Sequence, residues 1–396
     1  MSIPMSSPDL TEAEIAAVYQ VVTTRYLSIG PRVDAFEAAI SAYVGRAYGV
    51  GVNSGTSGLH LAVIAAGVGD GDLVLTTPFS FIASSNCILY ERGVPVFVDV
   101  DRRTGNIDPA LVSEAADDLA RGGEAARRWL PPALREVGVT GRLRAILPVD
   151  AFGQPADMDP IVQTAQRYGL YVIEDSCEAL GAEYKGRPAG SLGDVGVFAF
   201  YPNKQITTGE GGMIVTDRDD WNALFRSLRN QGRDVFDAWL NHTRLGYNYR
   251  LDEMSAALGL AQMERIDELL AKRAQVAAWY NERLAGQELI ETPVVAPETT
   301  RMSWFVYVVR ILPPAQRDAV MARLDAQGIP SRPYFTPIHL QPFYRERFGY
   351  GDGDFPVTEE LGRVSLALPF SSVMTQEQVD QVCEALIEAV NSERGH

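Results

Sequence analysis

Short apolar runs alternate with longer amphipathic segments along most of the chain. The runs at residues 48–52, 94–98 and 145–149 have the length and the β-branched content of buried strands. Between such runs lie stretches of helical length in which apolar residues recur at helical spacing. Strands that alternate with helices in this way predict a mostly parallel sheet with helices on both of its faces. We therefore expect an α/β protein.

The C-terminal part of the chain has a different pattern. A helix predicted from Asp252 to about Leu284 is long for a globular protein, so we expect it to bend or to link two domains. Prolines occur in the stretch 293–300, and a strand, a helix and a second short strand follow before a terminal helix. These boundaries predict a large domain at 1–250, and a linking helix with a smaller C-terminal domain at 251–396.

One lysine lies between two predicted strands in the segment VGVFAFYPNKQITTGEGGMIV, residues 195–215. Pro202 ends the first strand, because proline cannot donate a hydrogen bond to a sheet ladder. The glycines that follow permit a tight backbone path into the second strand. Most lysines are solvated surface charges. A lysine held at the mouth of a sheet, however, is suited to Schiff-base formation with a carbonyl, and Lys204 is therefore a candidate catalytic residue.

Two carboxylates, Glu174 and Asp175, follow a short strand of the buried type at 170–173. In α/β sheets, ligands bind at the carboxyl ends of the strands. An acid for a pyridinium nitrogen, together with a lysine for an aldehyde, is the arrangement found in pyridoxal phosphate enzymes. Asp175 and Lys204 are the pair that we expect to fill these roles.

The stretch NSGTSG, residues 53–58, joins a predicted strand to a predicted helix. Gly55 and Gly58 let the backbone approach an anion, and a helix N-terminus adds free N–H groups and a partial positive charge. Thr56 and Ser57 supply hydroxyl groups. An ordinary N-cap followed by a core helix explains these residues equally well, so the pattern alone leaves phosphate binding open.

Composition excludes several functions. The formal net charge of −16 argues against nucleic acid as a partner, because neutralising phosphates requires a basic surface. The three cysteines and four histidines lack metal-ligand spacing, which argues against a metal site and favours free thiols in a reducing compartment. The sequence has no signal-peptide pattern and no apolar run near the roughly 20 residues that span a bilayer. We expect a cytoplasmic protein that does not bind membranes.

The segment 108–142 is locally basic in this acidic chain. We expect a solvated helical insertion there, with a surface for a partner subunit or for a substrate phosphate as the alternative. The arginines of this segment and of the strand after it are Arg121, Arg127, Arg128, Arg135, Arg142 and Arg144.

The three motifs together carry a family resemblance. FYPNKQITTGEGG around Lys204, EDSCEALGA upstream and NSGTSGLHLA near the start occur in the order seen in the DegT-type nucleotide-sugar aminotransferases, which the chain resembles from about Leu27 to Leu386. That family belongs to the fold-type I, aspartate-aminotransferase-like superfamily. The resemblance implies pyridoxal 5′-phosphate as the cofactor. It also implies a large domain with a mostly parallel central sheet flanked by helices, and a smaller C-terminal α/β domain.

The resemblance further implies roles for single residues. Lys204 would hold the cofactor as a Schiff base and move a proton between the cofactor and substrate carbons, and Asp175 would keep the pyridine nitrogen protonated. Phe81 would stack on the ring. Glu178 would lie near the phenolic oxygen, where the family often has glutamine or histidine. Some relatives carry a phosphate-binding serine at the position of Ala199. The expected phosphate-binding residues here are Gly55, Thr56 and Ser57, with Asn248 reaching over from a neighbouring subunit.

The resemblance implies at least a homodimer with shared active sites, because the residue that matches Asn248 crosses the subunit interface in the family. Tyr247, Tyr249 and Trp239 near it have the aromatic composition of an interface core.

The expected reaction is a transamination from glutamate, or less often glutamine, to a keto-sugar joined to a nucleoside diphosphate. Arg332 and His339 are candidate substrate contacts, with purely structural roles as the alternative. A cyclitol aminotransferase shares all these motifs and stays open. A sugar dehydratase of this family would have histidine in place of Lys204. A non-catalytic sensing protein would not need both Lys204 and Asp175, and an amino-acid aminotransferase usually uses an arginine pair that we do not find in the sequence.

Overall fold

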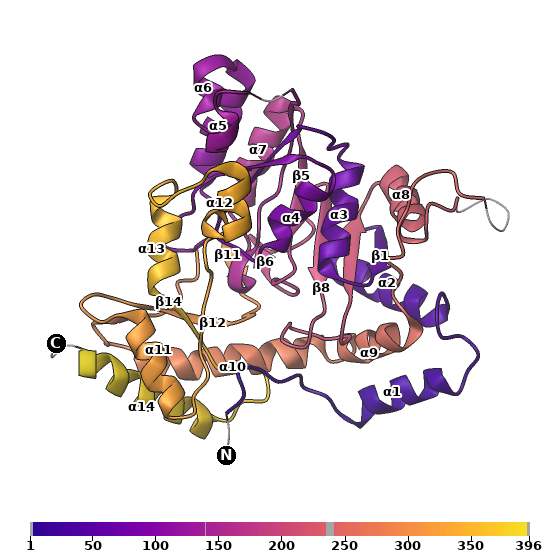
Figure 1. The fold of residues 1–396 in the computed structure, drawn as a ribbon. Coiled ribbons are helices and arrows are strands. Elements are labelled where there is room, and N and C mark those ends of the chain that lie inside the picture. The colour runs from indigo at the N-terminus through magenta and orange to yellow at the C-terminus, as the bar shows by residue number, and fades with distance from the viewer. Residues whose placement is uncertain (1–2, 139, 235–240, 394–396) are drawn as a thin grey trace.

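The structure is a computed structural model and describes residues 3–138, 140–234 and 241–393. A central sheet, which has seven strands among these residues, is covered by helices on both faces (Figure 1). This arrangement confirms the predicted α/β class. From one edge to the other, the strands are β1 (Tyr48–Val52), β9 (Gly212–Thr216), β8 (Val195–Ala199), β5 (Tyr171–Asp175), β4 (Leu143–Ile146), β2 (Leu73–Thr76) and β3 (Val94–Phe97).

The sheet is parallel from β3 through β2, β4 and β5 to β8. β9 lies between β8 and β1 and is antiparallel to both. Parallel neighbours need a crossover connection, whereas antiparallel neighbours can be joined directly, and β9 follows β8 without an intervening helix. This direct connection carries Lys204. Because Asp175 at the end of β5 pairs with Val197 of β8, the connection starts close to the carboxyl end of β5.

Alternate residues of the central strands point into cores on opposite faces. Val197 and Ile214 pack on one face, and Phe198 and Met213, one position away, pack on the other. Both faces are therefore shielded from water, as a mainly parallel sheet requires. The first face is covered by α3 (Gly55–Ala65), α4 (Ala83–Tyr90) and α8 (Asp219–Arg229), and the second by α2 (Pro31–Val44), α5 (Pro109–Arg121), α7 (Met158–Tyr168) and α9 (Glu253–Met263).

The C-terminal part has its own antiparallel sheet and its own core. Ile3, from the other end of the chain, is buried in this core, and the N–H of Phe370 donates to the carbonyl oxygen of Met5 at 3.0 Å. The N-terminal segment therefore packs with the C-terminal elements. The strand order is β10 (Ile290–Glu291), β12 (Tyr307–Ile311), β14 (Ser365–Leu368) and β13 (Arg332–Pro333), packed with α10 (Ile266–Leu284), α11 (Arg317–Ala326) and α14 (Gln376–Glu393).

The long helix predicted from residue 252 to 284 is broken into α9 and α10. Arg265, at the break, has φ of −115° and ψ of 10°, which is not helical. Its guanidinium pairs with Asp9 and Glu14 from the start of the chain and with Glu268 on α10. α10 then runs from the core beneath β8 and β9 into the C-terminal core, and it lies along the lower part of the molecule in Figure 1. α10 therefore contributes side chains to both cores.

α1 (Glu12–Val22) begins at a capping box formed by Thr11 and Glu14, a spacing that is visible in the sequence. The carboxylate of Glu14 accepts the N–H of Thr11 at 2.7 Å, and Glu14 is buried. The helix packs alongside α9 at the margin of the molecule (Figure 1). Ile15, Tyr19 and Val22 lie at helical spacing on α1 and are all exposed, so no described residue of the chain covers this apolar face of the helix.

The basic segment 108–142 forms helices as predicted, but the expectation that it is solvated is wrong in part. α5 is amphipathic and buries Val112, Ala115 and Ala116 in the core that it shares with α7. Arg128, in the same segment, pairs with Glu114 and Asp118 of α5. This local pairing neutralises part of the positive charge that the sequence displays.

The remaining elements include a third, small antiparallel sheet built from three short strands among the described residues. Tyr344 of α12 (Pro342–Phe348) packs against Phe97 of β3, so this C-terminal helix returns to the large sheet. No helix in the described part of the chain is long and apolar enough to cross a membrane. The other elements are β6 (Glu183–Tyr184), β7 (Arg187–Pro188), β11 (Thr299–Arg301), α6 (Gly123–Arg127), α13 (Pro356–Val364) and the 3-10 turns at Pro132–Leu134, Ala151–Gly153 and Ile338–Leu340.

Candidate active site

A cavity of about 530 Å³ opens where β5 and β8 end and where α3 begins. Its walls come from the central sheet and from the C-terminal part, which contributes Phe305, Tyr334 and Phe335. No described residue of the basic segment 108–142 lines it. Of the residues predicted from the sequence, the cavity brings together Gly55, Thr56, Phe81, Asp175, Glu178 and Lys204.

Lys204 lies in the connection between β8 and β9, and 13% of its side chain is exposed. The backbone turns at this point because the N–H of Lys204 donates to the carbonyl oxygen of Tyr201 at 2.9 Å. Its Nζ lies 3.7 Å from Oε1 of Glu178 and 3.8 Å from the centroid of the Phe305 ring. The amine is thus held between a carboxylate and an aromatic face, with its direction fixed.

Asp175 ends β5 and presents its carboxylate to the cavity. The hydroxyl of Ser84 donates to Oδ2 at 2.7 Å, and the N–H of Cys177 donates to Oδ1 at 3.2 Å. Ser84 stands in the first turn of α4 and accepts a hydrogen bond from the hydroxyl of Ser80 at 3.1 Å. Asp175 is almost fully buried, and a neighbouring donor orients each of its two carboxylate oxygens.

Glu174, the neighbouring carboxylate, has a structural role. Its oxygens accept the N–H groups of Gly190 at 2.6 Å, Leu192 at 2.9 Å and Gly193 at 3.2 Å. It is fully buried and does not line the cavity. Of the two acids that follow the predicted strand, only Asp175 faces the site.

Glu178 completes the polar wall beside Lys204. Its Oε2 accepts the N–H of Phe152 at 2.9 Å, while Oε1 faces the lysine. Burial raises the pKa of Glu178, and the positive charge of Lys204 opposes that effect. The result is a carboxyl group that binds a proton more tightly than a free glutamate does, next to a primary amine.

The N-terminus of α3 forms another wall. The Ser54 hydroxyl accepts the N–H of Ser57 at 3.1 Å, and the Ser57 hydroxyl donates to Asn53 Oδ1 at 2.7 Å. Ser57 is therefore engaged in the helix cap and does not line the cavity, whereas Gly55 and Thr56 do. Within the described residues, the N–H groups of Gly55 and Thr56 have no acceptor, as is usual in a first helical turn. These groups are available to an anion.

Gly55 allows α3 to begin this close to the sheet. A Cβ at this position would stand 2.8 Å from the Cβ of Ala199 and 2.8 Å from Sγ of Cys177. Any larger residue would push the helix N-terminus away from the ends of β5 and β8. Ala199 lies in the cavity wall beside it and offers no hydroxyl group.

Aromatic rings close the remaining sides. Phe81 lines the cavity and is 65% exposed, so its ring is free to stack on a bound molecule. On the side of the C-terminal part, Phe335 stacks on Phe152, with ring centroids 5.2 Å apart. Burial raises the pKa of Tyr334, whose phenol stays protonated.

Ser57 is not the only predicted site residue that lies outside this cavity. Asn248 is exposed, and its carbonyl oxygen accepts from the Asn53 side chain at 3.4 Å. Arg332 is exposed and donates to the carbonyl oxygen of Ser331 at 2.8 Å. His339 is fully buried, with Nε2 3.2 Å from Oε1 of Glu359, and burial lowers its pKa. Trp239, expected near Asn248, lies outside the described residues.

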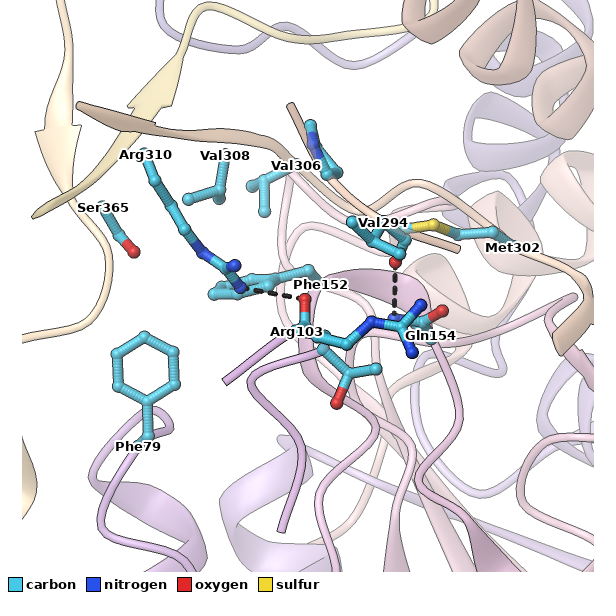
Figure 2. Close-up of a pocket in the computed structure, with 12 residues that line it drawn as sticks. Phe79, Arg103, Phe152, Gln154, Val294, Met302, Val306, Val308, Arg310 and Ser365 are labelled. Carbon is cyan, nitrogen blue, oxygen red and sulfur yellow. Dashed lines mark hydrogen bonds between the residues drawn. The ribbon is translucent and has the colours of Figure 1, made fainter. Parts of the chain in front are cut away.

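A second pocket, of about 30 Å³, lies between the two parts of the chain (Figure 2). There Arg310 donates to the carbonyl oxygen of Arg103 at 2.9 Å, and the amide of Gln154 donates to that of Val294 at 3.3 Å (Figure 2). This pocket has room for about two water molecules and for no larger ligand. We interpret it as part of the contact between the two parts of the chain, where these hydrogen bonds hold the loop at residues 152–154 against the C-terminal strands.

Sequence reasoning missed several residues of the site. Ser84 could have been found, because it lies only three residues after Phe81, a predicted site residue, and so close to the same wall. Phe305 and Tyr334 gave no such signal. They reach the cavity only because the C-terminal part folds back over the sheet.

A sheet with this topology, bearing an amine on one strand connection and a buried carboxylate at the end of the adjacent parallel strand, defines a class: the fold-type I pyridoxal phosphate enzymes. Comparison with known proteins narrows the class.

Residues 8–387 match the model of the DegT/DnrJ/EryC1/StrS aminotransferase family. GDP-perosamine synthase of Caulobacter vibrioides is 39% identical to this chain over 389 residues, which is 97% of each protein. The solved structure of S. venezuelae DesV superposes with a TM-score of 0.85 at 33% identity and 98% coverage of each chain. The PLP-form of Spr1654 from Streptococcus pneumoniae gives a TM-score of 0.87 at 25% identity, over 99% of this chain and 100% of that one.

The chain belongs to the DegT/DnrJ/EryC1/StrS aminotransferase family. It is an aminotransferase, and its cofactor is pyridoxal 5′-phosphate. The cavity has groups that fit this cofactor: a primary amine for an aldehyde, a buried carboxylate for a ring nitrogen and free N–H groups for a phosphate.

Proposed function

We propose that this protein moves an amino group from glutamate or glutamine to the keto group of a sugar carried on a nucleoside diphosphate. The observation that carries the proposal is that the amine of Lys204 and the carboxylate of Asp175 face one cavity. The name of the GDP-perosamine synthase relative, which is similar over nearly its whole length, supports a nucleotide-sugar acceptor.

Pyridoxal phosphate, when bound, supplies an aldehyde that bonds to amines and a ring that takes up electrons from the substrate carbon. Lys204 would hold that aldehyde and would later carry the proton between carbons with its freed amine. Asp175 would keep the proton on the ring nitrogen, and the hydroxyl of Ser84 keeps Asp175 aimed at the cavity. Glu178 holds the lysine in place from the other side and is the expected neighbour of the phenolic oxygen.

The walls of the cavity suit the rest of the cofactor. The N–H groups of Gly55 and Thr56, with the Thr56 hydroxyl, would bind the phosphate. Ser57 would support them through the cap of α3. Phe81 would cover one face of the ring by stacking. Because Ala199 contributes no hydroxyl, the phosphate needs another donor, and we expect Asn248 of the partner subunit to be that donor.

We also propose that the working unit is a homodimer whose active sites are shared between the chains. Asn248 is exposed and lies outside the cavity of its own chain, where it is available to a partner. Phe81, in the wall of the cavity, is exposed as well, so the cavity opens to a surface that another chain could cover. The bare apolar face of α1 supports the same assembly.

The central test is Lys204→Ala. We expect this variant to fold normally, to lose the absorbance of the lysine-bound cofactor and to lose amine transfer, because no other group in the described cavity is a primary amine. Lys185→Ala is the matched control, since Lys185 is also a loop lysine paired with a carboxylate but lies away from the cavity. Far-UV circular dichroism, visible spectra and mass spectrometry of the acceptor give the readouts. Full activity of Lys204→Ala would refute the proposal.

The acceptor is identified by offering the protein, with pyridoxal phosphate and glutamate or glutamine, a panel of keto-sugars. GDP-, UDP- and dTDP-linked keto-sugars should be compared with a keto-cyclitol that carries no nucleotide. We expect a mass change in a nucleotide-linked acceptor. If only the keto-cyclitol accepts the amino group, the proposed nucleotide-sugar substrate is wrong. The proposed roles of Lys204 and Asp175 would not be affected by that result.

A further inference from the structure

Arg273 of α10 is a buried cation that the roles described so far do not use. It is 2% exposed, and within the described part of the chain it forms no ion pair with a carboxylate. Burial lowers its pKa to about 10, so the guanidinium remains charged at neutral pH. A charge buried without a counter-ion is costly unless other groups solvate it. The groups around Arg273 therefore indicate what it does.

Four backbone carbonyl oxygens surround the guanidinium. Nη2 donates to the oxygen of Lys204 at 2.5 Å and to that of Asn203 at 3.2 Å. Nη1 donates to the oxygens of Trp304 at 3.1 Å and Phe305 at 3.2 Å. One side chain thus joins the connection between β8 and β9 to the segment that precedes β12. These segments belong to the two different parts of the fold.

Both segments place a side chain in the cavity, and the two side chains touch. The Lys204 amine lies 3.8 Å from the centre of the Phe305 ring. The chain must bend sharply to bring Phe305 there, since Trp304 has φ of 51°, in the left-handed region that residues with a side chain rarely adopt. A strained corner persists only when its surroundings hold it, and the Trp304 carbonyl is held by Arg273.

The corner is also held from the opposite side. The N–H of Phe305 donates to the carbonyl oxygen of Phe152 at 3.2 Å, and the N–H of Phe152 in turn donates to Glu178. Glu178 is the carboxylate that faces Lys204. These contacts form a closed network. It connects Arg273 to Lys204 through Phe305, Phe152 and Glu178, and the Lys204 carbonyl oxygen binds Arg273 directly.

We infer that Arg273 is a positioning residue that fixes the Lys204 loop against Phe305 and thereby sets the direction of the Lys204 amine. This inference rests on the proposed function for the role of Lys204. An arginine is needed because its planar fork presents separate donors to two pairs of acceptors. A lysine would bring three donors on a single nitrogen atom and could not reach both segments with the same geometry.

The test compares Arg273→Met and Arg273→Lys with a control on the same helix, Tyr280→Phe. Tyr280 is fully buried and donates to the carbonyl oxygen of Pro369 at 2.7 Å, so its variant also removes a buried hydrogen bond from α10, but away from Lys204. Two readouts avoid turnover. One is the rate at which an amine-directed reagent labels Lys204 in cofactor-free protein, measured by peptide mass spectrometry. The other is the pH midpoint of the visible absorbance after pyridoxal phosphate is added.

We expect Arg273→Met to label at Lys204 several-fold faster than wild type, to move the absorbance midpoint by about one pH unit and to lose kcat by about 100-fold, because a misplacement of about 1 Å costs that much. The KM for the amino donor should change far less than kcat. Arg273→Lys should fall between Arg273→Met and wild type in each readout, and Tyr280→Phe should match wild type in all of them.

The inference is overturned if Arg273→Met melts at a lower temperature yet keeps the wild-type labelling rate, midpoint and kcat. It is equally overturned if Tyr280→Phe shows the same changes. Should Arg273→Met fail to fold, Arg273→Lys decides by the same readouts. Failure of the proposed function is distinguishable, because it appears in the wild-type protein, as no amine transfer to a nucleotide-linked keto-sugar or no absorbance that depends on Lys204, whereas failure of this inference appears only in the Arg273 variants.

Discussion

At the scale of single residues, the direction of one carboxylate decides what the cavity can do. Asp175 is almost fully buried, and each of its oxygens is held by one donor, the Ser84 hydroxyl or the Cys177 N–H. Neither donor is charged, so neither competes with a cationic partner for the carboxylate inside the cavity. A protonated ring nitrogen is such a partner, and the strength of that contact depends on the charge of Asp175.

Asp175→Asn tests this charge without changing the shape of the residue. Cofactor should still bind, because Lys204 and the N-terminus of α3 are unchanged. The value of kcat should fall by about 100-fold, since a neutral amide forfeits a charge-assisted hydrogen bond of about 1.5–3 kcal/mol that holds the ring proton. Cofactor titration followed by steady-state kinetics measures both effects. Near-normal kinetics would show that Asp175 is the wrong carboxylate.

The residues that the sequence predicts best are those whose role depends on local context. Lys204 and Asp175 stand at the ends of recognisable strands, and the fold brings both to one cavity. Arg273 could not be predicted in this way, because on α10 it reads as one more charge of a long helix. Its significance depends on carbonyl groups of two segments that are distant in sequence. His339 shows the opposite case, a polar residue that suggests a substrate contact but is buried against Glu359.

At the scale of elements, a few charged groups fix how α1 and α9 meet α10. Gln262 at the end of α9 donates to Glu14 at 2.8 Å, and Arg265 at the break between α9 and α10 donates to it at 2.9 Å. The hydroxyl and the N–H of Thr11 donate to the other oxygen of Glu14. One carboxylate therefore caps α1 and anchors it to the joint between two other helices.

Glu14→Gln tests this anchor through its pH dependence. Burial alone would raise the pKa of Glu14, but the hydrogen bonds from Thr11, Gln262 and Arg265 lower it from 4.5 to about 2. A lowered pKa in the folded protein stabilises it above pH 4.5, and this contribution is lost as the pH falls from 4.5 through 2. We expect the variant to lose about 3 kcal/mol of unfolding free energy at pH 7, and less at pH 3.

Urea unfolding at both pH values measures this difference. Glu12→Gln is the control, because Glu12 lies on the same first turn but is exposed, and such surface changes usually stay within about 0.5 kcal/mol. If Glu14→Gln loses the same free energy at pH 3 as at pH 7, the stabilisation does not come from the ionised carboxylate.

The elements themselves were predicted where their signals are local. The capping box at Thr11 and Glu14 marks the start of α1, and the strands β1 and β8 begin where the apolar runs begin. The break between α9 and α10 was not located, because helix-forming residues continue across it. Arg265 departs from helical geometry while it pairs with Asp9 and Glu14, which are more than 200 positions away in the sequence. A contact of that range leaves no trace in the local pattern.

At the scale of the whole molecule, the cavity is built from the central sheet and the C-terminal part but is open at Phe81 and Tyr201, both more than half exposed. The exposed side chains of α1 also include three large apolar ones, Ile15, Tyr19 and Val22. Large apolar side chains clustered on a surface favour contact with another protein. In a dimer with two-fold symmetry, one interface would cover these surfaces on both chains. We therefore expect the complete active site to require two chains.

Asn248→Ala tests the contribution of the second chain to the site. Asn248 does not line its own cavity, so its loss should leave that cavity unchanged and weaken cofactor binding in the partner. In a hybrid of Lys204→Ala and Asn248→Ala chains, one of the two sites carries neither change. Mixing the two inactive variants, at a cofactor concentration too low for Asn248→Ala alone, should restore about a quarter of wild-type activity if chains of a two-fold dimer exchange at random. Activity and light scattering follow the exchange. A monomer that is fully active would contradict the proposed dimer. If chains exchange but activity does not return, the dimer can stand, but Asn248 does not contribute to the partner's active site.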